Sequence, residues 1–99
     1  MIYYVDVDDT LVRTVGSKVI PITATVTWLK ALDLSKDQVY LWSRGGAEYA
    51  RSIAFKLEIE GLITAFLPKP DIMVDDRDLS EWTHLLQWHP NQLTQGPKA

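Results

Sequence analysis

The stretch YYVDVDDTLV, residues 3–12, joins a strand-forming run to three carboxylates within four positions, Asp6, Asp8 and Asp9. Ile2–Val5 is a continuous run of aromatic and β-branched residues, which is typical of a strand that is covered on both faces in a parallel sheet. The carboxylates therefore stand at the carboxyl end of this predicted strand. Because clustered like charges repel, the pattern indicates a divalent cation, and Mg²⁺ prefers such hard oxygen ligands.

The length and composition indicate one globular domain. The chain has 99 residues, of which 46% are hydrophobic and four are tryptophan, so intrinsic disorder is excluded as a description of the whole chain. There is no cysteine, which excludes a disulfide framework and a thiolate metal site. No apolar run approaches the roughly 18 residues that a membrane span needs, and no basic segment precedes the first strand, so we expect a cytoplasmic protein without membrane association.

The elements after the first strand alternate in type. Two short β-prone arms flank Gly16-Ser17 and predict a small hairpin over 12–20. A helical spacing of apolar residues follows over 22–34, and a second helix is expected from about Ala47. Three further apolar runs predict strands, namely Val39–Trp42, Thr64–Leu67 and Ile72–Val74.

This alternation predicts an α/β fold, a Rossmann-like parallel sheet of four to five strands in a three-layer α/β sandwich, with the hairpin as a flap. The segment 79–89 fits either a helix or a short helix followed by an edge strand, and its periodicity does not decide. We expect a single domain over residues 1–90 and a poorly ordered tail over residues 91–99.

The chemistry-bearing residues gather where the predicted strands end. Ligands of open α/β sheets bind beyond the carboxyl ends of the strands. The residues that follow the four strands there are carboxylates, hydroxyls and cations: Asp6, Asp8, Asp9, Thr10, Ser43, Arg44, Lys69, Asp75 and Asp76.

These residues carry a resemblance to a known family. YYVDVDDTL, VYLWS, the lysine of PKP and IMVDD stand in order across Tyr3–Asp76, and they resemble the four motifs of the haloacid dehalogenase superfamily of phosphohydrolases. The resemblance implies a Mg²⁺-dependent phosphatase that acts on phosphomonoesters through an aspartyl-phosphate. Asp6 would be the nucleophile, and Asp8 would act as general acid and then as general base.

The same resemblance assigns the remaining roles. Mg²⁺ would be held by Asp6, by the backbone carbonyl of Asp8, and by the paired acids Asp75 and Asp76. The phosphate would be bound by a set of hydroxyls and cations: Thr10, which also shapes the turn after the nucleophile, Ser43, Arg44 and Lys69.

The family's large cap domains have no counterpart in this sequence. The two positions where caps are inserted correspond here to 11–42 and 44–68, which are filled by the predicted hairpin, helices and strand. An open site excludes water poorly. The absence of a cap therefore implies a macromolecular phosphorylated substrate, or a homo-oligomer in which a second subunit covers the site.

Two other classes of function stay open. In the first, Arg13, Lys18, Arg44 and Arg77 form a basic rim of a nucleic-acid end-processing 3'-phosphatase, although the net charge of −3 disfavours general nucleic-acid binding. WSRGG is similar to the wording in some polynucleotide 3'-phosphatases. In the second, the chain is a non-catalytic protein that binds Mg²⁺ or a partner. His84 and His89 are spaced wrongly for one metal-binding helix face.

Overall fold

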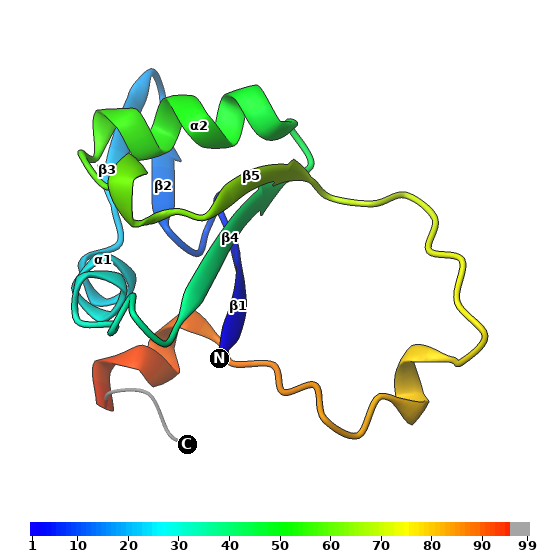
Figure 1. Cartoon of the computed structure of the whole chain (residues 1–99). Helices are drawn as coiled ribbons and strands as arrows, with labels where there is room; N and C mark the ends of the chain where they lie inside the picture. The colour runs from blue at the N-terminus through cyan, green and yellow to red at the C-terminus, as the bar shows by residue number, and fades with distance from the viewer. Residues whose placement is uncertain (96–99) are drawn as a thin grey trace.

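A three-stranded parallel sheet forms the centre of the molecule. The computed structural model describes residues 1–95, and its sheet consists of β1 (Ile2–Asp6), β4 (Gln38–Ser43) and β5 (Ala65–Pro68) in the order β1-β4-β5. Asp6 lies opposite Trp42, and Ser43 lies opposite Pro68. The carboxyl ends of the three strands therefore meet at one edge of the sheet (Figure 1).

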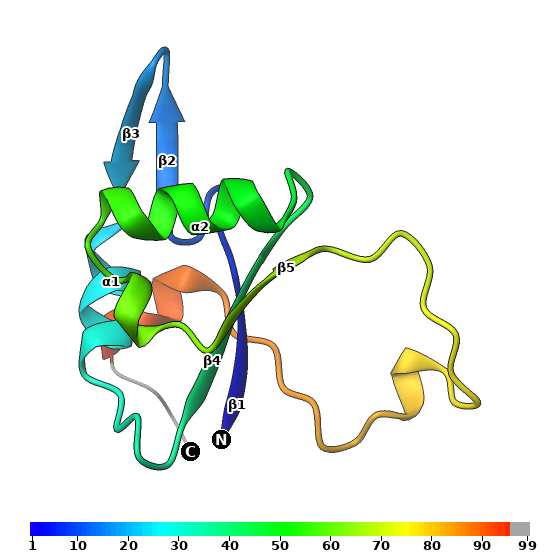
Figure 2. The ribbon, with the colours of Figure 1, turned by 45° about the horizontal axis from the view of Figure 1, so that its top comes forward.

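The predicted hairpin is confirmed. The strands β2 (Val12–Val15) and β3 (Lys18–Pro21) pair antiparallel across a turn in which Gly16 has φ +61°. Glycine adopts this left-handed conformation without steric cost. The hairpin projects away from the sheet (Figure 2), and it is anchored to the core by the fully buried Val12 and the partly buried Val19.

The two helices pack on the same face of the sheet. α1 (Thr23–Lys30) and α2 (Ala47–Lys56) bury Leu29 and Ile53 in one cluster with the strand residues Val39 and Leu41. Since side chains alternate along a strand, these strand residues point to one face only. Among the described residues, no helix is long and apolar enough to cross a membrane.

The opposite face of the sheet carries partly exposed aromatic side chains. The centre of the Tyr4 ring lies 5.2 Å from that of Tyr40, on which it stacks, and 5.0 Å from that of Trp42, which it meets edge-on. Tyr4 is nevertheless 52% exposed. A face covered by another layer would bury such rings. The structure thus has two layers, and the predicted three-layer sandwich with strands covered on both faces is not confirmed.

The fourth predicted strand, Ile72–Val74, is not formed. Only residues 69–71 separate it from β5, whereas a parallel pair needs a crossover of about a dozen residues or more. The segment instead follows a wide loop away from the sheet (Figures 1 and 2), and Val74 is 97% exposed. The sheet therefore has three strands, and four to five are not confirmed.

The C-terminal part contains short 3₁₀ helices. Besides η1 (Glu60–Leu62), these are η2 (Leu79–Glu81) and η3 (Pro90–Gln95), so the segment 79–89 forms neither an α-helix nor an edge strand. The chain returns to the body at Trp88, whose ring lies 6.5 Å from that of Trp28 on α1. Residues 91–95 of the predicted tail belong to η3, and the remainder of the tail lies outside the described residues.

Candidate active site at the carboxyl edge of the sheet

The turn after β1 fixes the acidic residues in space. The Val7 carbonyl accepts hydrogen bonds from the backbone N–H groups of Leu11 and Val12 at 2.9 and 3.1 Å, and both of these side chains are fully buried. Asp9 has φ +62°, a left-handed conformation that Asp tolerates better than most residues. The buried residues thus anchor a tight turn whose acids point away from the core.

Asp6 is held by two groups. Its Oδ1 lies 3.0 Å from Lys69 Nζ, and its Oδ2 accepts a hydrogen bond of 3.1 Å from Thr10 Oγ1. The side chains of Asp6 and Lys69 are 30% and 31% exposed, so the pair is open to solvent on one side. Lys69 Nζ also lies 5.8 Å from the centre of the Trp42 ring, which places this pair at the margin of the open aromatic face.

Thr10 is itself held by the first helix. Thr25 is fully buried on α1, and its hydroxyl donates a hydrogen bond of 2.6 Å to the Thr10 carbonyl. Because the Thr10 hydroxyl contacts Asp6, this bond connects the packing of α1 to the orientation of the candidate nucleophile.

Asp8 contacts the second helix. The Tyr49 hydroxyl donates a hydrogen bond of 2.6 Å to Asp8 Oδ1. This bond, followed by partial burial and the nearby carboxylate charge, raises the pKa of Tyr49 from 10.0 to about 12. Tyr49 therefore remains a protonated donor at neutral pH.

Ser43 and Arg44 lie at the end of β4, but neither is presented to a ligand in the way predicted. Ser43 is 1% exposed, and its Oγ accepts a hydrogen bond of 3.0 Å from the Gly45 N–H. Arg44 is turned towards Asp71, with 3.4 Å between Nη2 and Oδ1. The Ser43 hydroxyl can still donate its own hydrogen, so its burial and not the bond from Gly45 limits a role in phosphate binding, whereas Arg44 would have to turn from Asp71.

Asp75 and Asp76 stand on the exposed loop. Asp75 Oδ1 accepts a hydrogen bond of 2.9 Å from the backbone N–H of Arg77, a local turn contact. Within residues 1–95, no group of three or more His, Asp or Glu side chains is arranged to hold a metal ion. As placed, the acids do not fit the predicted magnesium site, because no fourth strand carries Asp75 and Asp76 to the edge where Asp6 and Asp8 lie.

The structure therefore brings together part of the predicted set. Asp6, Thr10 and Lys69 are in direct contact, and Asp8 follows Asp6 by two residues. The cations of the suggested basic rim do not form one patch, because the hairpin with Arg13 and Lys18 lies well apart from the loop (Figure 2).

Tyr49 and Trp42 are the contributors that the sequence predictions missed. Trp42 is the register partner of Asp6, so its place follows from the order of the strands. Tyr49 lies in the first turn of a helix that begins at the carboxyl edge, but its contact with Asp8 depends on the rotation of α2 and has no signal in the sequence.

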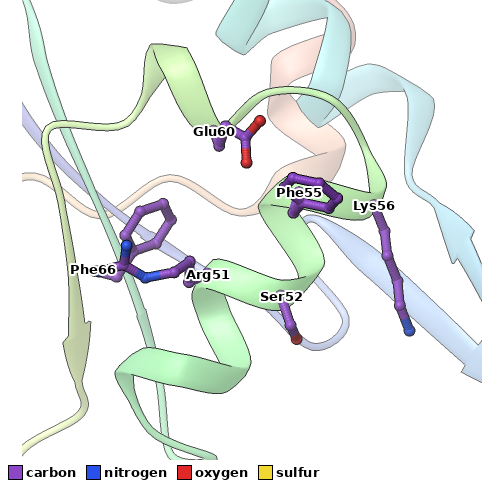
Figure 3. Close-up of a pocket in the computed structure, with 6 residues that line it drawn as sticks. All are labelled: Arg51, Ser52, Phe55, Lys56, Glu60 and Phe66. Carbon is purple, nitrogen blue, oxygen red and sulfur yellow. The ribbon is translucent and has the colours of Figure 1, made fainter.

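A separate hollow lies between α2 and β5 (Figure 3). It has a volume of about 640 Å³ and contains Arg51, whose guanidinium lies 5.1 Å from the centre of the Phe66 ring. None of the predicted site residues lines it; its lining residues are Arg51, Ser52, Phe55, Lys56, Glu60 and Phe66.

The fold and the site together define a small α/β protein with an acidic centre at the carboxyl edge of a parallel sheet. Searches of protein-family models, curated proteins and solved structures find no match to this chain. Its function is therefore inferred from its own residues.

Proposed function

We propose that the protein is a phosphomonoester hydrolase that works through an aspartyl-phosphate on Asp6. The observation that carries the proposal is the Asp6 carboxylate, which one cation and one hydroxyl hold in place at 3.0 and 3.1 Å. A carboxylate oxygen has two lone-pair sites, so these contacts leave electron pairs for attack on phosphorus. Lys69 offsets the negative charge that a phosphate brings towards a carboxylate.

The proposed reaction has two displacements. In the first, an oxygen of Asp6 attacks phosphorus, the bond from phosphorus to the ester oxygen breaks, and Asp8 gives that oxygen its proton. In the second, Asp8 takes a proton from water, the water oxygen attacks phosphorus, and the phosphorus–Asp6 bond breaks. Inorganic phosphate leaves, and both carboxyl groups return to their starting states.

The magnesium requirement is part of the proposal, although the acids as placed do not fit the ion. Asp6 and Asp8 would provide part of the shell, and Asp75 and Asp76 would complete it only after residues 70–78 moved to the carboxyl edge. Lys69 would stay on Asp6 during this movement, and the short link to β5 means that the movement would add no parallel strand to the sheet. Mg²⁺ would then neutralise the clustered carboxylates and the phosphate.

The phosphorylated substrate is proposed to be macromolecular, because the described residues form no cap over the site. A cytoplasmic location is part of the same proposal. A phosphorylated nucleic-acid end is the second candidate, because the aromatic face of Tyr4, Tyr40 and Trp42 borders the Asp6–Lys69 pair and aromatic rings stack well on bases. A second subunit is the other means of covering the site.

The test is hydrolysis of an aryl phosphate, with and without Mg²⁺, by the native protein and by Asp6→Asn. We expect turnover that needs the metal and falls by at least about 10³-fold in the variant, since the nucleophile is lost. A panel that adds a 3'-phosphorylated oligonucleotide tests the second candidate.

The matched control is Asp33→Asn, which makes the same substitution in the connection to the amino end of β4. The Asp33 carboxylate accepts local hydrogen bonds from Ser35, which an amide oxygen can also accept, so this variant should keep native activity. Full activity of Asp6→Asn with every ester would refute the proposed nucleophile.

A further inference from the structure

Tyr49 joins the second helix to the proposed general acid. It lies in the first turn of α2, 41 positions along the chain from Asp8, and its hydroxyl lies 2.6 Å from Asp8 Oδ1. The backbone of Asp8 is fixed by a bridge to Val12, but its side chain is exposed, and the tight turn leaves the orientation of the carboxylate free. The phenol is thus the side chain that restricts the Asp8 carboxylate to one orientation.

Gly45 explains how the Tyr49 ring reaches this position. A Cβ atom at residue 45 would lie 2.9 Å from Tyr49 Cδ2, closer than side chains tolerate, so the absence of a side chain leaves room for the ring. Gly46, with φ +102°, then turns the chain into α2. The two glycines of WSRGG therefore let the ring pack closely against the turn that follows β4.

We propose that Tyr49 is a positioning residue that holds Asp8 so that its second oxygen, Oδ2, faces the leaving group. This inference rests on the proposed phosphatase function. With Oδ1 occupied by the phenol, the proton that Asp8 transfers resides on Oδ2.

The leaving group of the substrate separates this role from a structural one. An alkyl phosphate releases a strongly basic oxygen that needs a proton from Asp8, whereas an aryl phosphate with an acidic phenol leaves with little help. kcat/KM reports the steps up to departure of the leaving group. A loss of Asp8 positioning should therefore affect kcat/KM for the alkyl ester far more than for the aryl ester.

The experiment compares Tyr49→Phe with the native protein on one alkyl and one aryl phosphate. We expect kcat/KM to fall by about tenfold or more for the alkyl ester and by less than about threefold for the aryl ester. The loss on the alkyl ester is a part of the roughly 10²–10⁴-fold that general acid catalysis contributes. Asp8→Asn should show the same preference with larger losses. Tyr3→Phe is the matched control, because the Tyr3 ring packs against the rings of Trp28 and Trp88 and belongs neither to the acidic centre nor to the aromatic face.

Two results would overturn the inference. Equal losses on both esters would indicate a general disturbance of the site, and kcat/KM values of Tyr49→Phe that equal those of Tyr3→Phe would show that the contact has no role. Both results are obtained while Asp6-dependent turnover persists. Absence of Asp6-dependent turnover in the native protein would instead reject the phosphatase proposal, and this inference with it.

Discussion

Residues 1–68 and residues 69–89 differ in what they bury. All the fully buried apolar side chains of the described chain lie between Val5 and Ile59. The second region exposes several large apolar side chains, among them Ile72 at 82% and Val74 at 97%. Both regions contain apolar runs of the same kind, so residue type alone does not explain the difference.

Two of these runs show what decides the outcome. VYLW at 39–42 lies between β1 and β5 and bonds to both, with α2 covering Val39 and Leu41. IMV at 72–74 follows β5 after only three residues. This link is too short to bring the segment beside the sheet as a parallel strand. An apolar run becomes a strand only where the connections bring it to a partner.

The largest expected effect concerns burial. Ile53→Ala should lower the free energy of unfolding by about 2–5 kcal/mol, because it removes buried methyl groups and leaves a cavity in the core. Val74→Ala should change it by less than about 0.5 kcal/mol, because the side chain is already in water. Urea denaturation followed by tryptophan fluorescence measures both values.

The same pair of variants can break the comparison. If Val74→Ala cost as much as Ile53→Ala, the loop would be packed in solution, and the two regions would not differ in the way described. Repeating the measurement with Mg²⁺ sharpens the question. A cost for Val74→Ala that appears only with the metal would indicate the movement of residues 70–78 that the proposed site requires.

A smaller effect is expected at the bond between α1 and the turn after β1. Thr25→Val removes the donor to the Thr10 carbonyl while keeping the shape of the side chain, so it should destabilise the protein by about 1–3 kcal/mol. Thr27→Val, on the exposed side of the same helix, is the matched control and should stay within about 0.5 kcal/mol. Equal values from thermal or urea unfolding would show that the buried hydroxyl adds nothing.

The fold could be predicted from the sequence where local pattern and connectivity agree. Ile2–Val5, the hairpin at 12–20 and Val39–Trp42 each combine β-prone residues with a turn or helix of suitable length, and all three form. The covering of the sheet could not be predicted in this way. Ile2–Val5 is apolar throughout, yet Tyr4 is half exposed, since aromatic residues tolerate an open face as well as a buried one.

The candidate site was predictable to the extent that topology determines it. Asp6 and Lys69 meet because both follow parallel strands of one sheet, and this pairing can be derived from the order of the elements. The Tyr49–Asp8 bond depends on the rotation of α2 about its axis, and Arg44 turns to Asp71 because a solvent-exposed side chain takes the nearest charge. Neither detail has a signal in the spacing of residues.

The smallest expected effect is the pH dependence of the Tyr49–Asp8 contact, which ties α2 to the turn after β1. Because the pKa of Tyr49 is about 12 in the folded protein and 10.0 as the unperturbed value, the contact's contribution to stability is complete below about pH 10 and is lost as the pH rises through about 12. The difference in unfolding free energy between native protein and Tyr49→Phe, from urea denaturation at successive pH values, should fall in that window.

The exposure of Asp8 keeps this difference small, since solvent screens the carboxylate. A difference that stayed constant up to about pH 12 would show that the phenol is not held by the carboxylate, and the well-packed region would then end at the core rather than extend to the site.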